Sequence, residues 1–110
     1  MHVISRKKLT RFGEEHAEAS DPLERWYRMV KKARWDTFAD IRADFPSADQ
    51  VGQFTVFNVG GNKFRLVVVV VFERGRVYVR HVLTHREYDT DAWKGDPGPR
   101  RLPKRRKDGT

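Results

Sequence analysis

Apolar residues are densest between residues 54 and 83, and their pattern predicts three β-strands joined by two tight turns. Residues 64–72 are almost continuously apolar and include five consecutive valines. β-branched side chains have restricted χ1 rotamers and fit a pleated strand better than a helix. A segment that is apolar on both faces is typical of a strand covered on each side. We therefore expect residues 64–72 to form the middle strand of a sheet.

Glycines mark the first predicted turn. Gly60 and Gly61 precede the valine-rich strand, and glycine readily adopts the positive φ that type I′ and II′ hairpin turns require. A two-residue loop at Gly60 and Gly61, or at Gly61 and Asn62, places Asn58 on the same face as Arg65. A three-residue loop would reverse that face, because a slip of one residue turns a strand over. Asn62 is otherwise explained as a turn residue.

The second turn sets the register of the last two strands. A two-residue loop at residues 74–75 places Arg65 opposite Thr84 and Val69 opposite Arg80, and cross-strand partners share a face of the sheet. One face then carries basic residues standing on valines: Lys63, Arg65, Val67, Val69, Val71, Tyr78, Arg80 and Val82. The other face is more apolar and is expected to be the core: Phe64, Leu66, Val68, Val70, Phe72, Val77, Val79, His81 and Leu83.

Helical periodicity precedes the strand-rich segment. Residues 2–5 are expected to form a short strand, followed by a helix over residues 6–18 with Ser5 as its N-cap. A second helix is expected to begin at Asp21 and Pro22 and to run to about residue 33, because proline is favoured at the first helical position. Its apolar residues have the spacing of one helix face and should pack on the sheet: Leu23, Trp26, Tyr27 and Val30.

Shorter elements complete the predicted fold. Residues 37–44 have the spacing of a third short helix, and residues 47–52 are expected to be a loop. Thr84 and Glu87 match a capping box, so the last strand should pass directly into a short helix that ends near residue 93.

Composition limits the classes of protein to which the chain can belong. Its 110 residues suffice for one domain with a modest core. The absence of cysteine excludes disulfides and thiolate metal sites. The valine run is too short to span a bilayer as a helix, and the first residues lack the apolar stretch of a signal peptide. We therefore expect a cytoplasmic protein that does not associate with membranes.

The formal net charge is +8, and most of the excess lies near the C-terminus. Residues 100–107 contain six of the 23 lysines and arginines and no acidic residue. We therefore expect a domain over residues 1–95 and a basic, disordered tail over residues 96–110. A basic tail is typical either of an arm that binds a polyanion or of a solubilising end.

Candidate chemistry gathers at one end of the predicted sheet. Arg65, His85 and Tyr88 lie there beside the start of a helix, where the helix dipole favours anions, and Arg80 lies further along the same face. Asn58, Asn62 and Lys63 belong to the same end. These groups suit RNA cleavage without a metal or other cofactor, which needs a base, an acid and positive charge on the phosphate. His85 or Tyr88 could transfer the protons.

Other polar residues have simpler explanations. His81 falls on the predicted core face and is expected to be a structural group. Arg25, Arg28 and Lys32 form a basic stripe on the second helix that could bind RNA or could simply face solvent. Arg65 is the hardest to explain structurally, because a cation next to a valine run on a middle strand needs an anionic partner or an open cleft.

Three segments resemble the HigB family of toxins from bacterial type II toxin–antitoxin systems: MHVISRKKL, FPSADQVGQFTVFNVGGNKFRL and VYVRHVLTHREYD. The resemblance covers about residues 1–94. It implies a RelE-like α+β fold in which two N-terminal helices pack on a small antiparallel sheet, with a short C-terminal helix. It also implies an endoribonuclease that cuts translated mRNA, often on the ribosome and without a metal.

The same resemblance implies partners and site residues. The partners are mRNA and a HigA-like helix-turn-helix antitoxin. Arg65, Arg80, His85 and Tyr88 match the residue types and positions expected of the catalytic groups. RNA contacts are expected from a second set of residues: Asn58, Asn62, Lys63, Arg25, Arg28 and Lys32. The alternative is a non-catalytic RNA- or ribosome-binding protein that uses the same basic face.

Overall fold

A computed structural model describes residues 1–99 of the chain. The basic run at residues 100–107 lies outside them. The described chain folds into five strands and four α-helices, with two short 3₁₀ helices. In chain order these are β1 (His2–Ile4), α1 (Lys7–Glu15), α2 (Ala17–Lys32), α3 (Phe38–Asp44), β2 (Asp49–Val51), β3 (Phe54–Val59), β4 (Phe64–Val71), η1 (Phe72–Arg74), β5 (Arg76–Thr84), α4 (His85–Asp89) and η2 (Ala92–Gly95).

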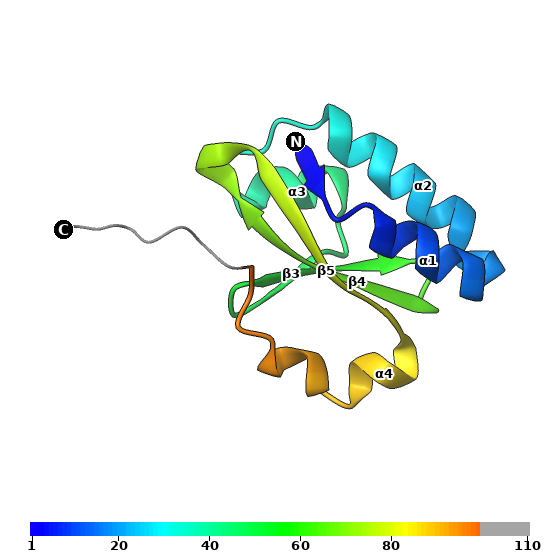
Figure 1. The fold of residues 1–110 in the computed structure, drawn as a ribbon. Helices are drawn as coiled ribbons and strands as arrows, with labels where there is room; N and C mark the ends of the chain where they lie inside the picture. Colours follow the sequence, from blue (N-terminus) through cyan, green and yellow to red (C-terminus); the bar gives the residue numbers. More distant parts are fainter. Residues whose placement is uncertain (100–110) are drawn as a thin grey trace.

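The strands form one sheet in the order β1-β5-β4-β3-β2, so β4 is the middle strand as its sequence predicts. The sheet is mixed and not purely antiparallel as expected, because β1 pairs with β5 in parallel. Figure 1 shows α1, α2 and α3 on one side of the sheet and α4 on the other. We call these the three-helix face and the α4 face. The described residues include no helix that is both long and apolar enough to cross a membrane.

The sheet separates two apolar clusters, and β4 contributes to both. On the three-helix face, residues of α1, α2 and α3 pack against one set of strand residues, which includes Leu66, Val68, Val77 and Val79. On the α4 face a smaller cluster comprises Phe54, Val56, Val67, Val69 and Trp93. Because Leu66, Val67 and Val68 are fully buried, this part of the strand is covered on both sides.

The predicted register of β4 and β5 is wrong. The connection is the 3₁₀ turn η1 followed by Gly75, and the two-residue loop expected at residues 74–75 does not form. Val69 therefore lies opposite Tyr78, where Arg80 was expected. Arg65 lies opposite Leu83, where Thr84 was expected.

A β-bulge in β5 changes the face on which several side chains lie. The register shifts at Val67 and Val68, which pair with His81 and Val79, so that Arg80 is the extra residue. One extra residue reverses the alternation beyond it. His81 and Leu83 consequently lie on the α4 face with Arg65, and the prediction that His81 belongs to the core face is wrong.

The first hairpin has one of the three registers considered from the sequence. Asn58 lies opposite Arg65, as a loop centred on Gly61 and Asn62 requires. Gly60 and Gly61 have φ values of +63° and +68°, and residues with a Cβ atom rarely adopt such positive φ values. The glycine pair thus allows the turn and keeps Asn58 and Arg65 on one face.

The first two helices differ from prediction at their starts. Ser5 has a φ of +73° and does not cap α1 with its side chain. α2 begins at Ala17, one turn before the predicted start, so that Pro22 lies inside the helix. Ala19 is fully buried and lies one turn before the buried Leu23, so packing on the sheet extends the helix despite the backbone hydrogen bond that proline cannot donate.

The shorter elements agree more closely with the sequence predictions. Thr37 and Thr84 both form the capping box at the starts of α3 and α4, which confirms the abrupt passage from β5 into α4. α4 is shorter than expected and ends at Asp89, and Asp91, with a φ of +63°, precedes η2. Residues 47–52 were expected to be a loop, but β2 lies within them. The burial of β2 is low, so hydrophobic pattern alone does not distinguish this edge strand from a loop.

Truncation of a buried side chain in the middle strand should destabilise this fold more than most substitutions. We expect Leu66→Ala to lower the free energy of unfolding by about 2–5 kcal/mol, because a fully buried side chain leaves a cavity in a packed core. Met29→Ala is the control, since Met29 is 47% exposed and its loss should change stability by less than about 0.5 kcal/mol. Urea unfolding followed by circular dichroism measures both, and similar stabilities for the two variants would contradict the proposed core.

Candidate functional site

Arg65 and Tyr88 meet on the α4 face, at the end of the sheet next to the first hairpin. The guanidinium carbon of Arg65 lies 5.5 Å from the centre of the Tyr88 ring, close enough for a cation–π contact. Arg65 also donates hydrogen bonds from Nη1 to two backbone carbonyls, at 3.0 Å to Asn62 and 3.2 Å to Phe64. Nδ2 of Asn58 lies 3.4 Å from Oδ1 of Asn62. The turn and the tyrosine therefore hold the guanidinium in place.

Tyr88 is itself fixed by the chain that follows it. Its ring stacks on Trp93, with ring centres 5.0 Å apart and planes 15° apart. The indole Nε1 of Trp93 donates a hydrogen bond to the carbonyl of Tyr88 at 3.0 Å. Because Trp93 is buried in the apolar cluster of the α4 face, it anchors the tyrosine to the sheet. Sequence reasoning treated residue 93 only as a helix end.

His85 lies at the start of α4, beside the hairpin but exposed. Its backbone N–H donates to the carbonyl of Lys63 at 3.1 Å, which ties the start of α4 to the turn. Its Nδ1 lies 3.2 Å from a carboxylate oxygen of Asp89, and both side chains are more than half exposed. Lys63 forms a similarly exposed pair with Glu18 at 3.2 Å. Exposed pairs of this kind are weak and easily exchanged for other partners.

Within residues 1–99, Arg65 has no acidic partner, unlike the other cations of this group. No carboxylate of residues 1–99 lies within ion-pair distance of its guanidinium, whereas both Lys63 and Arg80 have one. Arg65 is half-buried beside the valines of β4. A half-buried positive charge that no carboxylate of residues 1–99 compensates attracts anions.

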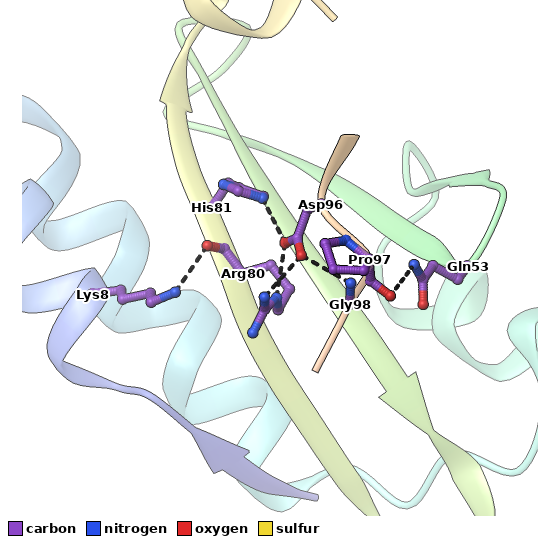
Figure 2. A network of polar contacts seen from close by, with 7 residues as sticks. All are labelled: Lys8, Gln53, Arg80, His81, Asp96, Pro97 and Gly98. Atoms are coloured by element: carbon purple, nitrogen blue, oxygen red, sulfur yellow. Dashed lines mark hydrogen bonds and ion pairs between the residues drawn. The ribbon is translucent and has the colours of Figure 1, made fainter. Parts of the chain in front are cut away.

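Arg80 belongs to a second cluster, built around Asp96 (Figure 2). Its Nε and Nη2 donate to the two carboxylate oxygens of Asp96 at 2.9 and 2.8 Å, a bidentate pair. The backbone N–H of Gly98 donates to the same carboxylate at 2.8 Å, and His81 Nε2 lies 2.8 Å from it. Nε2 of Gln53 donates to the carbonyl of Pro97 at 3.0 Å and holds the following segment on the sheet.

The Asp96 carboxylate is ionised over a wide range of pH. Hydrogen bonding from the Arg80 guanidinium is the largest cause that holds the pKa of Asp96 well below its usual range, with further lowering by Gly98 and His81 and opposition from burial. The same hydrogen bond raises the pKa of Arg80. Asp96 thus neutralises much of the charge of Arg80, whose Nη1 makes no hydrogen bond to the rest of residues 1–99.

The predicted basic stripe on α2 lies apart from both clusters. Arg25, Arg28 and Lys32 are exposed, and Arg28 pairs with Glu24 at 3.3 Å. α2 packs on the three-helix face, whereas Arg65 points to the α4 face. The structure therefore brings Arg65, Tyr88, Asn58 and Asn62 together but separates the stripe from them by the thickness of the sheet.

Comparison with known proteins identifies the family. Residues 19–91 match the family model HigB_toxin, described as the RelE-like toxic component of a toxin-antitoxin system. The matched region includes Arg65 and Tyr88 and ends before Asp96. This chain belongs to the HigB toxin family. The resemblance seen in the sequence is thereby confirmed.

Several proteins named HigB align with most of the chain. An Escherichia coli K12 protein named "mRNA interferase toxin HigB" is 36% identical over 92 residues, which cover 81% of this chain and 88% of that protein. A Shigella flexneri protein named "mRNA interferase HigB" has the same identity and coverage. Another from Escherichia coli O6:H1 is 29% identical over 81% of this chain and 89% of its own length.

Sequence reasoning missed Asp96, which organises the second cluster of this HigB family member. The residue stands between glycine and proline at the start of the predicted tail, where an aspartate is usually a turn residue. No local pattern connects it with a strand 15 residues earlier. The bulge that brings Arg80 and His81 to it was equally absent from the predicted register.

The Asp96 cluster should make stability depend on pH. Because the folded-state pKa of Asp96 is lowered, its contribution is complete above the unfolded value near pH 4 and is lost as the pH falls below it. We expect Asp96→Asn to lose about 1–3 kcal/mol near neutral pH, with a smaller deficit near pH 3. Urea unfolding at several pH values measures this, with the exposed Asp21→Asn as control. A deficit that stays constant from neutral pH to pH 3 would contradict the assigned role.

Proposed function

We propose that the protein is the toxin of a type II toxin–antitoxin system and that it cleaves mRNA as an endoribonuclease. The observation that carries this proposal is the half-buried Arg65, which has no acidic partner among residues 1–99 and is held against Tyr88 at the hairpin end of the sheet. The names of the related HigB proteins, all mRNA interferases, support the choice of mRNA as substrate.

The proposed reaction is an internal transfer of the phosphate. The ribose 2′-oxygen loses its proton to a base and bonds to the adjacent phosphorus, while the bond from phosphorus to the 5′-oxygen breaks. The leaving oxygen takes a proton from an acid, so that a 2′,3′-cyclic phosphate and a 5′-hydroxyl form. Arg65 stabilises the charge on the phosphate, and the Nη1 atom of Arg80 can add to it. We assign the proton transfers to His85 and Tyr88, which lie at the same end of the sheet.

RNA contacts outside the reacting phosphate are assigned to two surfaces. Asn58 and Asn62 border Arg65 and can bind the neighbouring nucleotides. Lys63, whose Nζ pairs with Glu18 of α2, is assigned to RNA binding as part of the same turn. The stripe on α2 lies across the sheet from the reacting site, so it is proposed to contact a second RNA segment, such as ribosomal RNA. The basic tail is assigned to the same contact by its charge. The toxin domain is taken as residues 1–95 and the tail as residues 96–110, and the RelE-like arrangement of helices and sheet is part of the same proposal.

A HigA-like helix-turn-helix protein is the proposed antitoxin, by family. The alternative function is a non-catalytic protein that binds RNA or the ribosome with the same basic face. The two differ in the product, because only the first cuts RNA. Primer extension on mRNA from cells that express the protein therefore separates them: new 5′ ends support the endoribonuclease, and growth arrest without them supports the alternative.

Loss of Arg65 should abolish toxicity without unfolding the protein. We expect Arg65→Ala to reduce cleavage of mRNA in a translating extract by about 100-fold or more, because one donor to the developing charge is removed. Arg42→Ala is a matched control, since Arg42 is an exposed arginine of α3 with no ion pair among residues 1–99. Full activity of folded Arg65→Ala protein would remove Arg65 from the proposed site.

The stripe on α2 should affect binding more than chemistry. We expect the triple variant Arg25→Ala, Arg28→Ala, Lys32→Ala to bind ribosomes or RNA more weakly and with a smaller dependence on salt concentration, because fewer counterions are released. The rate at saturating substrate should stay within a few-fold of the wild-type rate. An unchanged salt dependence would show that the stripe only faces solvent.

A further inference from the structure

The bulge in β5 places His81 on the face of the sheet that carries Arg65. Arg65 pairs with Leu83 across β4 and β5, and His81 pairs with Val67. His81 and Arg65 are therefore diagonal neighbours on one face, with Cα atoms about 7–8 Å apart. Long side chains at such positions can reach one small group between them. A regular strand would have pointed the imidazole into the core instead.

Asp96 fixes the imidazole of His81 in one orientation. The ionised carboxylate can only accept hydrogen bonds, and its oxygen Oδ2 lies 2.8 Å from Nε2 of His81. The ring hydrogen must therefore be on Nε2 when the imidazole is neutral, which leaves Nδ1 as the nitrogen that can take or give a proton. The His81 side chain is 28% exposed, so the imidazole is not sealed in the core.

Several elements place charged residues around His81. Asp96 approaches from the segment after η2, Arg80 from β5 itself, and Arg65 lies on the neighbouring strand. Lys8 of α1 reaches the carbonyl of Arg80, donating from Nζ at 3.1 Å. Arg80 compensates the carboxylate, and its bidentate grip keeps Asp96 pointing at the imidazole (Figure 2).

The other histidine near the site is held less firmly. His85 pairs through Nδ1 with Asp89, and both side chains are more than half exposed. In contrast, the Asp96 side chain is only 8% exposed and receives four hydrogen bonds or close polar contacts. An orienting carboxylate behind an imidazole is the arrangement by which enzymes hold a general acid or base in one tautomer.

We propose that His81, oriented by Asp96, is one of the two proton-transfer residues of the RNA cleavage reaction. The inference rests on the proposed function and adds a residue to it. Through Nδ1, His81 either takes the proton of the 2′-hydroxyl as the new bond to phosphorus forms, or gives a proton to the 5′-oxygen as its bond to phosphorus breaks. His85 or Tyr88 performs the other transfer. Asp96 and Arg80 act on His81 as positioning residues.

The test compares His81→Gln with wild type on a short RNA substrate across the pH range. Glutamine can still donate to Asp96 but cannot transfer protons, so we expect folded protein that binds RNA and cuts it about 100-fold or more slowly. The pH–rate profile should lose the limb that His81 contributes, whereas the limb of the second proton-transfer residue should remain. The control is His2→Gln, because His2 is exposed on β1 and lies away from the site.

A substrate with sulfur in place of the 5′-oxygen tells the two roles apart. Sulfur leaves without being protonated, so restored cleavage by His81→Gln identifies His81 as the acid, whereas continued loss identifies it as the base. Asp96→Asn provides a second variant with the histidine in place, and its rate should fall by about 10-fold or more because the ring can change tautomer.

Three results would overturn the inference. One is a His81→Gln rate within a few-fold of wild type, and another is a reduced rate with an unchanged pH profile, which indicates a structural role. The third is full activity of Asp96→Asn. If wild-type protein neither arrests growth nor cuts RNA, the proposed function fails and this inference fails with it. If wild type and His81→Gln cut RNA at similar rates, the proposed role of His81 is rejected and the proposed function stands.

Discussion

The pairing of β4 with β5 is the constraint on which the rest of the structure depends. β4 is buried on both faces through its middle, so neither face can tolerate a displaced register without exposing valines or burying charge. The strand leaves this double cover toward both ends, at Arg65 near its start and at Val70 and Val71 near its end. Arg65 is the charged residue of β4, and it lies at the end of the strand that carries Tyr88.

The bulge at Arg80 lets the same pairing serve two purposes. On one side of it, Val77 and Val79 complete the core of the three-helix face. On the other side the alternation is reversed, so His81 and Leu83 turn to the α4 face. Irregular strands often occur next to functional sites because they redirect a side chain without moving the sheet. Here one extra residue brings an imidazole, a guanidinium and the carboxylate of Asp96 together.

Arg65 and Arg80 have different electrostatic environments in this fold. Arg80 has a carboxylate partner, and its charge is largely compensated within the protein. Arg65 has backbone carbonyls and an aromatic ring as partners, which orient it and leave its charge available. One guanidinium is thus open to an anion, whereas the other holds the Asp96 carboxylate. The HigB family match, which includes both arginines but ends at residue 91, does not cover Asp96.

The sequence by itself determined the middle strand, the glycine turn, the capping box at Thr84 and the family, because each depends on local composition or on a short motif. It also brought Arg65 and Tyr88 to one end of the sheet, since both lie close to turns that the residues specify. Only the tertiary structure decided the bulge, the extension of α2 past Pro22 and the contact of Asp96 with His81. These features arise from packing between segments distant in the chain, where burial outweighs local preference and a shift of one residue changes the face on which a side chain lies.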